Sequence, residues 1–398
     1  MHKTFWFQLH WFLGFVFGIL LLIVGVSGAI LSYEKEIMNV INKDTYTVQI
    51  PQNQERLKEA EILKIFHEKN PSEKINSISF SSDLGKSISV NVAKEGERRG
   101  VTTYLNPYTA EVLPELVGKD FFMFVFRLHR WLAFEGTIQG VGKQAVALAT
   151  IAAILLTIGG IIVYWPRIKN GFVKSLTFSF KHKKRAFLST MHGAIGMWVV
   201  PFFLLMCLTG LYWSYDWYRS AMFTVFQVEQ PKRAAPPQQA QGQGQGQKEQ
   251  QANKTQNGEN RVQKQVIAYD DIASTVNFFN SNVARDYRNA SLRLEPSKNG
   301  TYTISYLFAD ATHFRESNSM EIDFKNEKIV KESKYEDKKL NEKIMSSMLP
   351  LHSGEFFGWF GKLSYFISSA LMALFVITGY MLYYDRWKKK RAKALKQK

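Results

Sequence analysis

The sequence predicts a membrane α-helical protein with α+β domains outside the membrane, in which four transmembrane helices form two repeats. The first observation is four strongly apolar runs of roughly 20 residues, the length that an α-helix needs to cross a bilayer. The second is that the first run matches the third and the second matches the fourth. The third is that long polar stretches with strand-like alternation separate the first run from the second and the third from the fourth. The runs cover residues 9–33, 144–165, 191–215 and 364–384.

Four histidines are among the matched positions. The first run falls on the third without a gap at a shift of 182 positions, and the second falls on the fourth at a shift of 219. His129 and His352 precede the second and fourth runs and match at a shift of 223. Because ionisable side chains are costly in lipid, imidazoles at matched places indicate a functional role. The other matched pairs include His10 with His192, Gly14 with Gly196, Gly28 with Gly210, Gly142 with Gly361 and Arg167 with Arg386.

Basic residues predict the orientation of the helices. Most of the formal net charge of +17 lies in the link between the second and third runs and in the tail after the fourth. The excess of Lys and Arg in cytoplasmic loops places both segments, and hence both termini, in the cytoplasm. We therefore expect a multi-pass membrane protein with two domains on the outer side, which is the periplasm if the cell is Gram-negative. The positive net charge is explained by the orientation of the helices and by contact with anionic membrane lipids. Nucleic acid is therefore not an expected partner.

The first run has a competing interpretation as a cleaved signal peptide, since Ser27-Gly28-Ala29 resembles a processing site. Its apolar stretch is too long for a typical signal core, and it matches the third run, which cannot be a signal. The single cysteine, Cys207, excludes a disulfide framework and a thiolate metal site.

Each polar stretch begins with a helical pattern and continues with alternating strands. In the first we expect a helix at 53–68 and strands at 75–81, 87–93, 102–105 and 111–113. In the second we expect a helix at 269–280 and strands near 290–295, 301–308 and 319–324. The segment 230–261 consists of Gln-Gly repeats and other polar residues with almost no apolar side chain, so it is expected to be a disordered insertion.

Several strings resemble the PepSY-associated transmembrane family. LNPYTAEVL at 105–113 is similar to the strand–turn–strand signature of PepSY domains. The strings that resemble the membrane part are LHWFLGF at 9–15, RLHRWLAFEG at 127–136, YWPRIKNGF at 164–172, RAFLSTMHGAIGMW at 185–198 and LTGLYWSY at 208–215. The family comprises iron-regulated inner-membrane proteins, some of which are dihaem reductases of ferric siderophores. The resemblance therefore implies a haem-binding membrane protein that delivers electrons outward.

The resemblance implies two units, each with a transmembrane helix, a PepSY-like domain and a second transmembrane helix. The first unit has a transmembrane helix at 1–33, a periplasmic PepSY-like domain at 34–120, and a periplasmic-side segment with a transmembrane helix at 121–166. A cytoplasmic basic loop at 167–190 leads to the second unit, with a transmembrane helix at 191–215, a periplasmic PepSY-like domain at 216–348, and a periplasmic-side segment with a transmembrane helix at 349–385. A basic cytoplasmic tail follows at 386–398.

One histidine pair at each side of the membrane is the arrangement expected for two haems b, each with two axial imidazoles on its iron. From topology we pair His10 with His192 and His129 with His352 as ligands of haem iron. Gly14 and Gly196 lie one turn after His10 and His192 on the same helix face, where a missing side chain lets a flat porphyrin approach. The alternative explanation of these glycines is close helix packing.

Other polar and aromatic residues near the histidines are weaker candidates. Arg127, Arg130 and Arg167 are suited to haem propionates because guanidinium pairs well with carboxylate, although anchoring at the membrane interface explains them equally well. Tyr33, Tyr215, Trp131 and Trp359 fit an interfacial aromatic belt.

The sequence thus predicts a dihaem electron-transfer protein, a ferric-siderophore reductase, that reduces a periplasmic ferric acceptor and releases its iron. No glycine-rich dinucleotide fingerprint follows a predicted strand, so the donor is expected to be quinol or a separate reductase. An alternative of another class is a PepSY-based, membrane-anchored peptidase inhibitor or scaffold without redox activity, which leaves the four histidines unexplained. A siderophore transporter predicts broken helices or polar residues in mid-membrane, whereas the runs contain only Pro201 and a few Ser and Thr.

Overall fold

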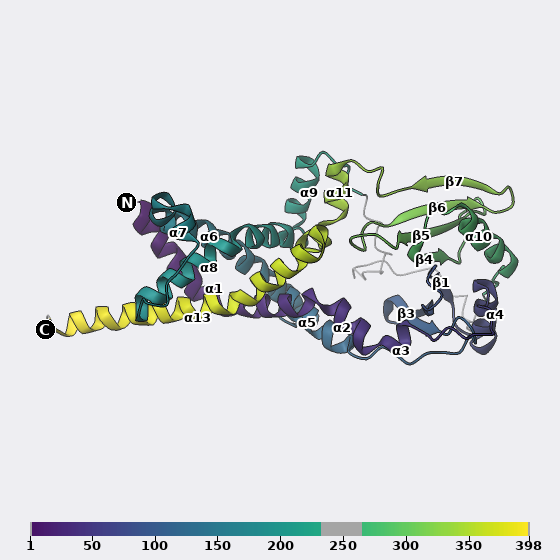
Figure 1. Ribbon diagram of the computed structural model, residues 1–398, viewed down its shortest axis with the longest axis horizontal. Coiled ribbons are helices and arrows are strands. Elements are labelled where there is room, and N and C mark those ends of the chain that lie inside the picture. The colour runs from purple at the N-terminus through teal and green to yellow at the C-terminus, as the bar shows by residue number, and fades with distance from the viewer. Residues whose placement is uncertain (1, 232–264, 397–398) are drawn as a thin grey trace, which may run out of the picture.

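The protein consists of a bundle of long helices at one end and a β-sheet domain at the other (Figure 1). The computed structural model describes residues 2–231 and 265–396, so the insertion predicted at 230–261 lies almost entirely outside the described residues. Both chain termini lie at the end of the bundle that is farthest from the sheet. We refer to the two ends of the bundle as the termini side and the sheet side.

Four helices in the described residues are long and apolar enough to cross a membrane, which confirms the predicted number of spans. Large apolar side chains remain exposed on their outer faces, such as Ile19 at 62% and Phe12 at 53%, as expected for contact with lipid. The helices are α1 (His2–Ser32), α6 (Gln139–Asn170), α8 (Lys184–Leu211) and α13 (Gly358–Lys396).

The four helices pack in a ring. Both α1 and α8 pack against α6 and against α13, so α1 and α8 lie diagonally across the bundle. Two short helices join the bundle at the sheet side. Helix α5 (Lys119–Trp131) packs against α1 and α6, and α12 (Met348–Ser353) packs against α8. The diagonal arrangement brings the inner faces of α1 and α8 toward one central space.

The two soluble regions share a single antiparallel sheet of seven strands in the order β3-β2-β1-β4-β5-β6-β7. Three strands come from the first region and four from the second, and β1 joins β4 with Ser79 opposite Ser291, whose hydroxyls are 2.9 Å apart. The strands are β1 (Ile75–Phe80), β2 (Ile88–Lys94), β3 (Glu97–Leu105), β4 (Tyr287–Arg293), β5 (Tyr302–Phe308), β6 (Asn318–Asp323) and β7 (Lys328–Ser333). That the two halves of the chain are repeats of one unit remains a prediction.

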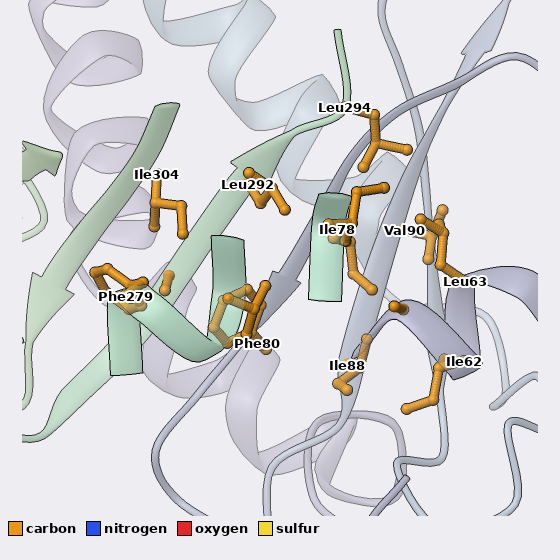
Figure 2. Packing of buried hydrophobic residues seen from close by; sticks show 14 of the residues in the cluster. Ile62, Leu63, Ile78, Phe80, Ile88, Val90, Phe279, Leu292, Leu294 and Ile304 are labelled. Carbon is orange, nitrogen blue, oxygen red and sulfur yellow. The ribbon is translucent and has the colours of Figure 1, made fainter. Parts of the chain in front are cut away.

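One apolar core unites both halves of the sheet domain. Helices α4 (Glu59–Lys69) and α10 (Tyr269–Asn282) supply side chains that pack on one face of the sheet. Ile62 and Leu63 of α4 and Phe279 of α10 are buried against strand residues such as Ile78 and Leu292 (Figure 2). Burying a side chain of this size contributes about 1.5–3 kcal/mol to folding. The two soluble regions therefore stabilise each other.

Some local predictions differ from the structure. The strand predicted at 111–113 is wrong, because only an isolated bridge joins Leu105 to Val112, and Ala110 turns the chain with a φ of 55°. Helix α4, which was predicted to begin at residue 53, begins at Glu59. Strand β7 and several short helices were not predicted. These helices are α2 (Glu34–Ile41), α3 (Lys43–Tyr46), α7 (Phe172–Ser175), α9 (Asp216–Val225) and α11 (Leu340–Ser346), with 3-10 turns η1 (Gly136–Ile138) and η2 (Glu355–Phe357).

Candidate functional site

The first pair of histidines meets in the centre of the bundle. His10 lies on α1 and His192 lies on α8, each eight residues after the first residue of its helix. Because α1 and α8 are diagonal, both imidazoles point into the same space, with ring centroids 6.4 Å apart and planes at 78°. We call them the termini-side pair.

The second pair lies at the sheet side of the bundle. His129 near the end of α5 and His352 on α12 have ring centroids 6.2 Å apart and planes at 59°. Two glycines allow these imidazoles to approach the long helices. A Cβ atom at Gly28 would lie 3.1 Å from Cε1 of His129, and one at Gly210 would lie 3.1 Å from Cε1 of His352. We call these histidines the sheet-side pair.

The turn that follows each sheet-side histidine also depends on a glycine. A Cβ atom at Gly142 would lie 2.0 Å from the carbonyl oxygen of Trp131, and one at Gly361 would lie 2.5 Å from that of Gly354. Any larger residue would push the histidine segment away from the start of α6 or α13. This requirement explains why the two glycines occupy matched positions in the sequence.

Backbone carbonyls hold three of the four imidazoles in place. Nδ1 of His10 lies 2.9 Å from the carbonyl oxygen of Leu156. Nδ1 of His129 lies 3.0 Å from that of Val24, and Nδ1 of His352 lies 2.9 Å from that of Met206. A carbonyl only accepts hydrogen bonds, so in all three rings Nδ1 carries the proton and Nε2 carries the free lone pair.

Hydroxyl groups lead to the same tautomer. The Thr378 hydroxyl donates to the carbonyl of Leu374 at 2.7 Å, so its oxygen accepts from Nδ1 of His192 at 2.7 Å. Ser27 and Thr209 likewise donate to carbonyls of their own helices and lie 3.2 Å and 3.1 Å from Nδ1 of the sheet-side imidazoles. All four imidazoles therefore present Nε2 as a base.

The spacing of the rings fits a metal ion bound between them. An imidazole nitrogen lies about 2 Å from a bound metal, and the ring centre lies roughly 1 Å beyond it, so two axial imidazoles have centres roughly 6 Å apart. Both pairs have this separation. Metal-bound histidines usually donate their other nitrogen to a carbonyl or an oxygen, as these four do. A metal ion held by two imidazoles alone would need further donors, of the kind that a cofactor supplies.

Burial favours the uncharged, ligating form of the sheet-side pair. It lowers the pKa of His352 to about 4, with smaller effects from the neighbouring His129 and Arg130. Burial also lowers the pKa of His129. Both rings are therefore neutral at pH 7 and ready to bind a metal without first losing a proton.

A cavity of about 320 Å³ adjoins the termini-side pair and is lined by all four long helices. Gly14 and Gly196 line it one turn after the histidines, and a Cβ atom at either would come no closer than 3.8 Å to another side chain. Most other lining residues are apolar, including Phe203 and Phe375. Two imidazoles over an apolar cavity with glycine walls provide what a flat, largely apolar macrocycle requires.

The three arginines singled out in the sequence occupy different environments. Arg127 forms an ion pair of 2.5 Å with Glu135. Arg167 donates to the carbonyls of Lys174 and Thr177 and so fixes the basic loop. Arg130 is half-buried beside Trp131, and its charge acts on both sheet-side imidazoles. Of the three, only Arg130 has this electrostatic link to a histidine pair.

Sequence reasoning missed two arginines that line the termini-side cavity, Arg185 and Arg386. The match of Arg386 with Arg167 was the available signal. The aromatic candidates have ordinary interfacial contacts. Tyr33 contacts Phe366, Tyr215 donates to Gln144, Trp131 packs on Phe126, and Trp359 is 76% exposed.

The chain is similar to one known protein family over most of its length. Residues 7–386 match the family described as PepSY-associated TM region. The chain belongs to this family. The match confirms the resemblance seen in the motifs and includes all four histidines of this PepSY-associated transmembrane protein. No match was found among curated protein sequences.

Proposed function

We propose that this protein is a dihaem membrane electron carrier, with one haem b held by His10 and His192 and the other by His129 and His352. The observation that carries the proposal is that two imidazole pairs have the ring separation of axial ligands, and each Nδ1 is engaged by an acceptor. Haem iron with two axial imidazoles supplies one-electron transfer and leaves no position for oxygen.

The placement of the two pairs fits transfer across a membrane. His10 is 14 residues from Val24, whose carbonyl holds His129, so the two pairs are separated by about 21 Å along α1. The bundle keeps both pairs out of water, and the glycines let the helices close around them. Electrons would enter at the termini side, from quinol or a separate reductase, and leave at the sheet side.

The acceptor that we propose is a ferric siderophore or another ferric chelate bound at the sheet side. Reduction to ferrous iron weakens the hold of hard oxygen donors, so one electron releases the metal. The sheet domain lies at the sheet side of the bundle (Figure 1), the side at which the acceptor would bind. The protein would then be a ferric-siderophore reductase of the bacterial inner membrane.

The first test is a reduced-minus-oxidised visible spectrum of the detergent-purified protein, with a pyridine haemochrome assay for stoichiometry. We expect low-spin b-type bands and two haems per chain. Replacing any one of the four ligands with alanine should leave one haem, whereas the exposed His182→Ala is the matched control and should keep both. A colourless protein made with ample haem supply would refute the redox function and favour the peptidase-binding alternative.

A second test addresses the acceptor. Proteoliposomes with a quinol pool receive a ferric hydroxamate together with a ferrous-specific chelator, and the coloured ferrous complex is followed with time. We expect formation that depends on both histidine pairs. Rapid haem reduction without ferrous complex would show an electron carrier with a different acceptor.

A further inference from the structure

The termini-side cavity has two arginines at one end, and most of its other lining residues are apolar. Its two arginines, Arg185 and Arg386, come from α8 and α13. Arg185 precedes His192 by seven residues, and Arg386 follows Thr378 by eight, so each lies about two helical turns from the level of the His192–Thr378 contact. Both lie toward the termini side. The cavity therefore has imidazoles at its middle and two guanidinium groups at one end.

Neither arginine has an ion-pair partner among residues 2–231 and 265–396. The Arg386 guanidinium lies over the ring of Phe7 at 4.6 Å, and Arg185 is half-buried. In contrast, Arg127 is paired with Glu135, and Arg167 is bound to two carbonyls. Cations at the mouth of an apolar cavity favour an anionic group, since bidentate pairing with carboxylate is the strongest contact a guanidinium makes.

We infer that Arg185 and Arg386 bind the two carboxylates of the macrocycle that fills this cavity, so that its acidic edge faces the termini side. The inference rests on the proposed function, because it takes that macrocycle to be haem. It deepens the proposal by fixing the orientation of the cofactor. A ligand with an apolar body, a central metal and two acidic groups on one edge matches the chemistry of the cavity. Phosphates of anionic lipids are the competing source of negative charge.

The test measures haem loss from the full-length protein to excess apomyoglobin, by absorbance. We expect Arg185→Gln and Arg386→Gln each to speed the loss of the termini-side haem about tenfold or more, because a hydrogen bond between two charged groups is stronger than one between neutral groups. The sheet-side haem should be lost at the wild-type rate and serves as the internal reference. Arg391→Gln removes the same charge from α13 outside the cavity lining, where the guanidinium lies over the ring of Trp387, and should change nothing.

A second arm replaces haem with its dimethyl ester, which has no free carboxylate. Wild type and both variants should then lose the termini-side macrocycle at the same fast rate, and Arg→Lys variants should be intermediate with free haem. Equal loss rates for wild type and variants with free haem would overturn the inference, as would equal retention of haem and ester. Loss of bound lipid phosphate in the variants, with unchanged haem loss, would assign the arginines to lipid. A protein that binds no haem at all would refute the proposed function itself.

Discussion

Thr378 offers a sharp test of how the protein sets the properties of one site. Its hydroxyl accepts from Nδ1 of His192 at 2.7 Å, whereas the other three histidines donate to backbone carbonyls that no substitution removes. Thr378→Val keeps the shape of the side chain and deletes this acceptor. An acceptor on Nδ1 makes the imidazole a stronger electron donor and favours ferric iron. Its loss should therefore raise the midpoint potential of the termini-side haem.

The magnitude follows from the strength of one hydrogen bond. A neutral hydrogen bond contributes about 1 kcal/mol. If it is lost entirely from the ferric state, a one-electron potential rises by about 40 mV, since a tenfold change in equilibrium corresponds to about 59 mV. Spectroelectrochemical titration resolves such a shift. Thr378→Ser should restore the wild-type potential, because serine keeps the acceptor.

Thr157 provides a matched control for the same experiment. It lines the same cavity, but its hydroxyl donates to the carbonyl of Ala153 in its own helix at 2.7 Å. Thr157→Val should leave both potentials unchanged. The reasoning is refuted if Thr378→Val shifts neither potential, lowers the termini-side one, or moves both haems together.

Further predictions concern the glycines and the sheet core. In Gly28→Ala or Gly210→Ala, the new Cβ atom would lie 3.1 Å from an imidazole, so we expect one haem per chain in the haemochrome assay. Gly140→Ala, where a Cβ atom meets nothing within 4 Å and which lies outside the termini-side cavity, should keep two. Gly196→Leu fills the termini-side cavity and should also leave one haem, but at the sheet side. Ile78→Ala should lower the unfolding free energy of the sheet domain by about 2–5 kcal/mol, and hydrogen exchange should rise in β1–β3 and β4–β7 together, whereas a rise confined to one half would contradict a shared core.

The pairing of strands from the two soluble regions could not be predicted from the sequence. Alternation predicted strands near β1, β2, β5 and β6. In β2, β5 and β6 every second side chain is buried through most of the strand, and in β1 this holds from Ile78 to Phe80. The contact between β1 and β4 joins residues about 210 positions apart, and no local pattern encodes it. Strand β7 was missed because only Ile329 packs against the core, which leaves almost no alternation to detect.

At the histidines, the pairing of the imidazoles could be predicted from the sequence, but the hydrogen-bond and ion-pair partners of the nearby side chains could not. Matched positions and topology predicted which histidines belong together, and the structure brings His10 to His192 and His129 to His352. The carbonyl acceptors were unpredictable, because every residue has a carbonyl and only the helix packing selects one. Arg127 was a candidate for binding a haem propionate because it lies two residues before His129. The acid that engages it, Glu135, lies across a turn whose path the sequence does not reveal.

The two pairs are mechanically linked through the same two helices. Helix α1 carries His10 and also supplies the carbonyl that holds His129. Helix α8 carries His192 and supplies the carbonyl that holds His352. Each helix thus carries one histidine of the termini-side pair and positions one histidine of the sheet-side pair. A change in the tilt of α1 against α8 would alter both ring separations at once.

The sheet domain is tied to the same structure at the point where electrons are proposed to leave. Lys35, just beyond α1, lies over the ring of Phe314 at 4.1 Å and forms an ion pair of 2.9 Å with Glu355. His313 stacks on Phe356, four residues after His352, at 5.5 Å. The loop between β5 and β6 therefore rests directly on the segment that holds a sheet-side ligand. An acceptor bound at this end of the sheet domain would lie next to the proposed electron exit. Through the contacts of Lys35 and His313, its binding would affect the position of His352.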